Sequence, residues 1–164
     1  MGLDMYLHKR KYFRSYDLSK PGLDGDVIEA KVTVERTYRD GTSNTEEMTI
    51  PEPRGSSSIA VETPVAYWRK ANMIHRWFLK AGGVEVDDCT PIYIKPAQLQ
   101  ELIDTCKEVL ADHSKAEKLL PTQSGCFFGD TEYNEYYFDD LEDTIKQLEG
   151  QRDTECSYIY QASW

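Results

Sequence analysis

The sequence lacks any long apolar run. Its first ten residues, MGLDMYLHKR, already carry charges and do not provide the stretch of about 7 to 15 apolar residues that an export signal needs. No stretch approaches the roughly 18 uninterrupted apolar residues of a membrane span. The sequence therefore predicts a cytoplasmic protein that does not enter the membrane.

Motifs for metals, cofactors and disulfides are also lacking. The three histidines and four cysteines form neither a CxxC pair nor the spacing of a zinc site. There is no glycine-rich phosphate loop. We expect no metal and no cofactor. In a chain without an export signal we also expect four free thiols, at Cys89, Cys106, Cys126 and Cys156.

Positive charge is scarce. The 19 basic residues are outnumbered by 29 acidic ones, giving a net charge of -10, so general binding to nucleic acid is not expected. The charge is uneven, because residues 64–81 carry bases without an acid, whereas 130–143 carry acids without a base. Those acids are Asp130, Glu132, Glu135, Asp139, Asp140, Glu142 and Asp143. This acidic run is either a solvated helix face or a surface that docks on a basic partner or mimics nucleic acid.

The length of 164 residues and a hydrophobic content of 40% predict a single domain over 1–164. At the start, Leu3, Met5 and Leu7 alternate with polar residues, as in a half-buried strand. The β-prone stretches 27–38 and 42–50 flank Asp40-Gly41, a hairpin signal. The piece PEPRGSSS then predicts a mobile loop over about 51–60.

Helical periodicity dominates the second half. It predicts a helix over 64–81 that Gly82-Gly83 ends, one that begins at Pro96, a short one with a capping box at Ser114 and Glu117, and a last one over 135–148. A short strand at 91–94 and a terminal strand in SYIYQASW complete the pattern. The sequence predicts an α+β fold: a mainly antiparallel sheet with three to four helices packed on one face, the last strand pairing near the first.

The segment VAYWRKANMIHRWF is the first candidate site. On the predicted helix, Trp68, Asn72 and His75 share a flank and offer a stacking ring, an amide and an imidazole that titrates near neutrality. Arg69 and Arg76 lie close enough to serve an anionic group. These are the parts of a site for a nucleotide or another planar anionic ligand. The alternative is that the ring and the histidine are packing residues.

The segment LLPTQSGCFFGDTEYNEYYFDDL is the second candidate. Its glycines permit close approach of the backbone, and it holds five aromatic rings within eleven residues, more than a core is expected to bury. The candidate binding residues here are Gln123, Phe127, Glu132, Tyr133 and Tyr136. The alternative is that two or three rings pack on helix 64–81 and the rest are ordinary surface tyrosines.

The segment VDDCTP places two carboxylates before a cysteine. Asp87 and Asp88 could bind a hard cation or act on Cys89, but neighbouring acids raise the pKa of a thiol and oppose its activation. A turn capped by carboxylates is the favoured interpretation. No Ser-His-Asp or Cys-His arrangement is recognisable by spacing.

A resemblance to a known family is carried by five segments: GLDMYL, YWRKANMIHRWF, VDDC, LLPTQSGCFFGDTEYNEYYFDDL and the terminal YQASW. Together they resemble a family of small proteins encoded by bacteriophages and prophage-bearing bacteria, to which no activity is assigned. The resemblance covers most of the chain and is weakest over 27–63. Similar members usually have an aromatic residue where this chain has Cys126. The resemblance implies a phage context in the cytoplasm of a bacterial host cell, where small accessory proteins often act by binding.

Three functions follow. In the first, the protein binds a host protein or an anionic planar ligand in host takeover or counter-defence, with segments 64–81 and 122–137 facing each other. In the second, it is a small nucleotide-processing enzyme in which His75 acts as general acid or base beside Glu132 or Asp88. In the third, it is an acidic decoy for a nucleic-acid-binding host protein. The deciding observation is whether Trp68, His75, Glu132 and Tyr133 converge on one open pocket.

The cysteine assignment leads to a direct prediction. Because a cytoplasmic chain has no means of keeping structural disulfides oxidised, all four cysteines should be reduced. Thiol titration of the unfolded protein, without added reductant, should therefore count all four. A count of two or none would contradict the assignment.

Overall fold

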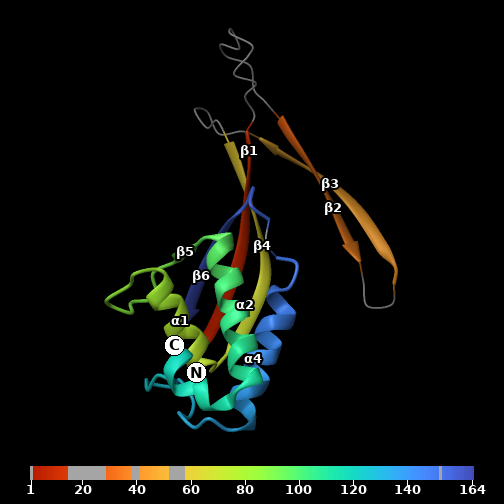
Figure 1. Cartoon of the computed structure of the whole chain (residues 1–164). Helices are drawn as coiled ribbons and strands as arrows, with labels where there is room; N and C mark the ends of the chain where they lie inside the picture. The colour runs from red at the N-terminus through yellow and green to blue at the C-terminus, as the bar shows by residue number, and fades with distance from the viewer. Residues whose placement is uncertain (1, 15–28, 38–40, 52–57, 152) are drawn as a thin grey trace. The chain divides into compact units, whose positions relative to one another are not determined.

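The structure is a computed structural model that describes residues 2–14, 29–37, 41–51, 58–151 and 153–164 (Figure 1). The chain divides into two compact units. One combines Met1–Lys11 with Glu62–Trp164, and the other spans Tyr12–Val61. Most of the loop expected at about 51–60 falls on 52–57, outside the described residues. At its ends, Pro51 and the residues from Ser58 onward belong to strands instead.

The larger unit is built on a four-stranded sheet with the order β4-β1-β6-β5. The strands of this sheet are β1 (Asp4–Arg14), β4 (Ser58–Arg69), β5 (Ile92–Ile94) and β6 (Ser157–Ser163), and the end of β1 and the start of β4 belong to the smaller unit. Strand β6 pairs antiparallel with β1, from Asp4 opposite Ser163 to Arg10 opposite Ser157, and antiparallel with β5. The prediction that the last strand pairs with the first is confirmed.

Helices lie over one face of this sheet (Figure 1). They are α1 (Asn72–Ala81), α2 (Pro96–Ala111), the 3-10 turn η1 (His113–Lys115), α3 (Ala116–Leu119) and α4 (Glu135–Leu148). The predicted α+β class, with a mainly antiparallel sheet and helices on one face, is confirmed. In the described part of the chain, no helix has the length and apolar character needed to cross a membrane.

The smaller unit contains the expected antiparallel pair, β2 (Glu29–Thr37) and β3 (Ser43–Pro51). The register runs from Glu29 opposite Pro51 to Thr37 opposite Ser43. Gly41, in the turn signal Asp40-Gly41, has a φ of 84°, which a glycine adopts without the steric cost of a side chain. Residues 38–40 of the connection lie outside the described residues.

The predicted helix over 64–81 is wrong in its first part. Residues up to Arg69 belong to β4, and the helix begins only at Asn72. These residues form a strand and not a helix, because their side chains point to alternate faces: Ala66 and Trp68 are buried, whereas Tyr67 is 45% exposed. Tyr67 lies four residues before the buried Ala71, so it matched the helical period by chance. The chain then turns at Lys70, which has a φ of 63°.

Capping also differs at one place. The short helix near 114 is capped not by Ser114 and Glu117 but by Asp112, whose side chain accepts a hydrogen bond from the Ser114 N–H at 3.1 Å. The predicted bounds of the last helix are confirmed, and Asn134 caps it by accepting a bond from the Tyr137 N–H. Pro96 stands in the first turn of α2, as predicted.

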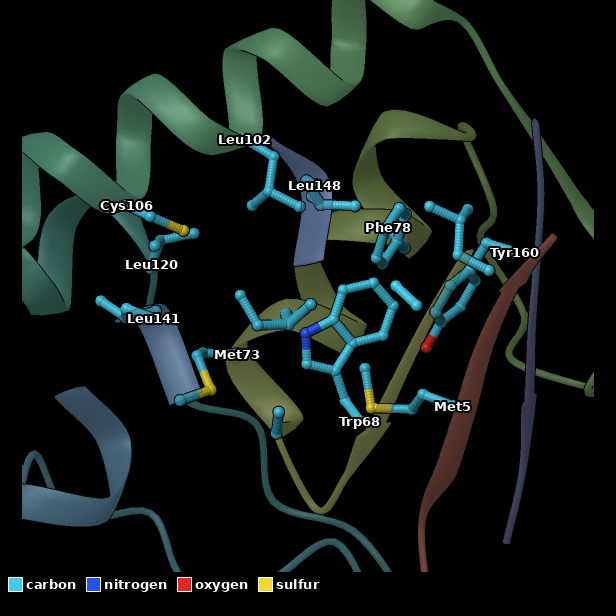
Figure 2. Close-up of a cluster of buried hydrophobic side chains, with 14 of the residues drawn as sticks. Met5, Trp68, Met73, Phe78, Leu102, Cys106, Leu120, Leu141, Leu148 and Tyr160 are labelled. Atoms are coloured by element: carbon cyan, nitrogen blue, oxygen red, sulfur yellow. The ribbon is translucent and has the colours of Figure 1, made fainter. Parts of the chain in front are cut away.

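The core fills the space between the sheet and the helices (Figure 2). Phe78 of α1 stacks on Tyr160 of β6 with ring centroids 4.0 Å apart, and Trp68 packs against the same Phe78 at 5.6 Å. Cys106 of α2 is fully buried, and that burial raises the pKa of its thiol to about 12, so it packs as a core residue. All four cysteines are free thiols in the structure.

The core positions generate a stability prediction. Ile74 on α1 and Leu141 on α4 are both fully buried. Replacing either by alanine leaves a cavity, so Ile74→Ala and Leu141→Ala should each lower the free energy of unfolding by about 2 to 5 kcal/mol. Chemical denaturation measures this directly. A nearly neutral result for either variant would place that side chain outside the core.

Candidate functional site

Asn72 joins the two segments that the sequence suggested as halves of a site. Its side chain is only 3% exposed. The amide Nδ2 donates hydrogen bonds to the carbonyl oxygens of Phe128 at 3.2 Å and Asp130 at 2.8 Å, and Oδ1 accepts one from the Gln123 N–H at 2.9 Å. The start of α1 therefore holds the loop before α4 in place. The prediction that the two segments face each other is confirmed at this contact.

A residue near the N-terminus also holds the loop before α4 in place. The Leu3 N–H donates to the carbonyl oxygen of Phe127 at 3.3 Å. Gly129 has a φ of 93°, and a Cβ there would lie 3.3 Å from the Cβ of Lys70. A glycine is therefore needed where the loop passes β4, both for its backbone conformation and for the close approach. The glycine at 129 therefore lets the loop backbone approach another part of the same chain, and this close contact is not one with a partner.

A cleft of about 400 Å³ opens between the end of β4, the loop and the first turns of α4. We call it the acidic cleft, because its lining has four carboxylates and two cations. It is lined by Arg69, Lys70, Asn72, Met73, Thr122, Gly129, Asp130, Glu132, Asn134, Tyr136, Tyr137, Asp139 and Asp140. Four of the predicted binding residues, Arg69, Asn72, Glu132 and Tyr136, come together here.

Asp140 is the unusual carboxylate of this cleft. Its side chain is half-buried, and none of the described residues gives its carboxylate a hydrogen bond or an ion pair. Burial, reinforced by the neighbouring charges of Asp143 and Asp139, raises its pKa to about 6. A carboxylate held in this way is stabilised by any cation that enters the cleft.

The aromatic rings of the second segment divide between core and surface. Tyr137 is buried and its hydroxyl donates to the carbonyl oxygen of Leu120 at 2.8 Å. Phe128 is buried as well. Tyr133 leans edge-on against Tyr137, with ring centroids 5.0 Å apart, whereas Phe127 is half exposed and Tyr136 is 77% exposed. Of the predicted recognition rings, Tyr136 is the one that both lines the cleft and projects into solvent.

A second cleft, of about 410 Å³, lies on the other side of Met73, between α1, α2 and α3. We call it the basic cleft, because its lining has three cations and one carboxylate. It is lined by Met73, Arg76, Trp77, Lys80, Glu101, Thr105, Lys118, Leu119, Leu120 and Pro121. Arg76 was a predicted binding residue, but Trp77 and Lys118 were missed. For Trp77 the sequence offered one signal, namely that an aromatic ring directly follows the candidate cation Arg76.

Trp68 does not provide the stacking surface that the sequence suggested. It lies on a strand, its side chain is only 3% exposed, and its Nε1–H donates to the hydroxyl of Thr144 at 2.8 Å inside the core. The expectation that Trp68, Asn72 and His75 share a helix flank is wrong, because the helix begins after Trp68. The alternative interpretation as a packing residue is confirmed for this ring.

His75 is also enclosed. Its side chain is 1% exposed, with Nε2 at 2.8 Å from Oδ2 of Asp87 and Nδ1 at 2.7 Å from the hydroxyl of Tyr160. An ionised carboxylate only accepts, so Nε2 carries a proton and donates to Asp87. A neutral ring then accepts the Tyr160 O–H at Nδ1. Both nitrogens are used inside the protein.

The partners proposed for a catalytic His75 were therefore wrong. Its carboxylate is Asp87, not Asp88 or Glu132. Asp88 accepts the Thr90 N–H at 3.0 Å, which confirms the capped turn, and Glu132 lines the acidic cleft. A general acid or base must come within reach of a substrate proton. His75 lines neither of the two clefts and has no ring nitrogen left to offer.

Among the residues that the structure describes, no group of three or more histidine, cysteine or acidic side chains is arranged to hold a metal ion. Comparison of the chain with family models, with curated proteins and with solved structures found no match. The two clefts and the side chains that line them are the candidate sites in the described part of the chain.

The contacts of Asn72 generate a prediction. Asn72→Ala removes the three hydrogen bonds of a buried side chain and takes these partners from two loop carbonyls and the Gln123 N–H, so it should lower the free energy of unfolding by about 2 to 4 kcal/mol. The Gln123 amide should also exchange its hydrogen faster. The same substitution at Asn44, which is exposed on β3, serves as the control and should be nearly neutral. Unchanged protection at Gln123 would show that the loop does not depend on Asn72.

Proposed function

We propose that this protein is a binding protein that docks a basic segment of a partner protein in the acidic cleft. The observation that carries the proposal is Asp140, a half-buried carboxylate on the cleft wall that forms no ion pair with the described residues. Burying a charge without a partner is costly. A lysine or arginine side chain from a partner would remove this cost on binding.

The other residues of the acidic cleft also favour binding of a cationic side chain. Asp139 and Glu132 add two more carboxylates to the lining, and the exposed ring of Tyr136 can pack along the stem or over the charged head of an inserted side chain. Arg69 and Lys70 stand at the β4 end of the same cleft. They would meet carbonyl or carboxylate oxygens that flank the inserted residue, and so fix the direction of the bound segment.

The resemblance to phage-encoded proteins supports a bacterial host protein as the partner, in host takeover or counter-defence. Such a basic partner could be a protein that binds nucleic acid. The acidic cleft would then act as a decoy that takes the place of the nucleic acid. One observation favours keeping this second candidate: α4 continues the acidic surface beyond the cleft with the exposed residues Glu135, Glu142 and Asp143. Competition with duplex DNA for an identified partner separates a decoy from an ordinary docking site.

The experiment uses the full chain and a short arginine-rich peptide as probe, measured by calorimetry at low ionic strength. Asp140→Asn should weaken binding by about tenfold or more, because a charge-assisted contact contributes about 1.5 to 3 kcal/mol. Tyr136→Ala should weaken it by about twofold to thirtyfold, because a cation over an aromatic ring contributes about 0.5 to 2 kcal/mol. The matched controls are Asp104→Asn and Tyr93→Ala, which lie outside the cleft and are exposed. They should bind as the unchanged protein does.

The same peptide gives a pH test. Arginine keeps its charge, whereas Asp140 gains a proton as the pH falls through about 6, so affinity should decrease between pH 7.5 and pH 5. Asp140→Asn should remove that part of the pH dependence. Equal binding by the cleft variants and their controls would refute the acidic cleft as the docking site. If the cleft variants do weaken binding of the peptide, crosslinking at Tyr136 in host extract would identify the partner.

A further inference from the structure

We propose that the basic cleft is a second binding site, for a small ligand that combines an anionic group with a flat ring, such as a mononucleotide. This inference is independent of the partner docking proposed above, because it concerns the opposite side of Met73 and ligands of opposite charge. Four features of the cleft support it: its charge, the placement of Arg76, its apolar wall and its size.

The charge of the lining is opposite to that of the molecule. Arg76, Lys80 and Lys118 outnumber Glu101 in a chain whose net charge is -10. Among the described residues, neither Lys80 nor Lys118 has an ion pair. Two lysines on nearby elements do: Lys107 of α2 pairs with Glu149 at 2.9 Å, and Lys115 of η1 pairs with Glu108 at 2.7 Å. A local excess of cations on an acidic protein attracts anions to this cleft.

Arg76 is held in position. One guanidinium nitrogen, Nη1, donates to the carbonyl oxygen of Thr122 at 3.0 Å, and this is its one hydrogen bond to the described residues. A guanidinium has five N–H donors in a fixed plane, so the others remain available to a phosphate or carboxylate. Lys80 follows one helical turn later on the same face of α1, and Lys118 stands on α3 across the cleft. The cations converge from two elements.

The remaining wall is apolar and includes one large ring. Trp77 is partly buried against Phe78, with ring centroids 5.3 Å apart, and lines the cleft together with Met73, Leu119, Leu120 and Pro121. Such a wall suits a flat ring, which stacks or packs edge-on against indole. The volume of about 410 Å³ falls in the range of about 300 to 1,000 Å³ typical of small-molecule sites.

The test titrates the full chain with adenosine, guanosine, cytidine and uridine 5′-monophosphates, with adenosine and with inorganic phosphate, and follows heat and tryptophan fluorescence. At least one monophosphate should bind saturably and about tenfold more tightly than either adenosine or inorganic phosphate, because both parts of the ligand contribute. Binding should weaken as salt is raised. The phosphate arm distinguishes a site for free anions from one that also needs a ring.

Variants locate the site. Arg76→Gln and Lys118→Gln should each weaken binding of that monophosphate by about tenfold or more. Lys146→Gln, which removes a cation from the exposed surface of α4, is the matched control and should leave affinity unchanged. All three should keep their melting temperature and their affinity for the arginine-rich peptide, so that failure here is separable from failure of the acidic cleft.

Two results would overturn the proposal as a whole, and a third would refute the role of the ring. One is the absence of saturable binding by all four monophosphates up to about 10 mM, since a site of this kind should bind well below that concentration. The other is binding that the two cleft variants and the Lys146→Gln control weaken equally, which would mark a diffuse electrostatic effect. Tighter binding of inorganic phosphate than of any monophosphate would likewise refute the role of the ring.

Discussion

The hydrogen bonds of Asn72 are the interaction on which both clefts depend. A buried amide that lacks partners is costly, so the three bonds to Gln123, Phe128 and Asp130 strongly favour one position of the loop before α4. That position brings the first turns of α4 to the end of β4 and so forms the acidic cleft. It also places the carbonyl of Thr122 where Arg76 can donate to it at the edge of the basic cleft.

Two clefts of opposite charge on either side of Met73 are a consequence of this arrangement. Charges of opposite sign at close range would neutralise each other by forming ion pairs, as Lys107 and Glu149 do. Here α1 stands between them, with Arg76 and Lys80 on one side and Asn72 on the other. Each cleft therefore keeps side chains that the fold itself does not use. Recognition of a partner requires such side chains, because groups already paired inside the protein have little to gain from a ligand.

His75 illustrates the opposite case. Its imidazole joins α1, β6 and the loop after α1 through Tyr160 and Asp87, and aromatic rings enclose it, among them Phe128 at 5.2 Å and Trp164 at 5.7 Å. Burial of a polar ring is tolerated because both nitrogens are paired. The more accessible end of this chain of bonds is Asp87, not the histidine. That geometry suits a structural tie between elements better than proton transfer to a substrate.

The sequence by itself determined much of the fold, because alternation and helical periodicity are local properties. The alternation of Leu3, Met5 and Leu7 predicted a strand where β1 lies, and the periodicity over 135–148 predicted α4 with its observed bounds. Local pattern failed at residues 64–69, where Tyr67 matched the helical period by chance while pairing with β1 held the segment in the sheet. It also could not tell Trp68 from Trp77, or Asp87 from Asp88. Which ring is buried and which carboxylate meets His75 depends on residues distant in sequence, and only tertiary packing brings those together.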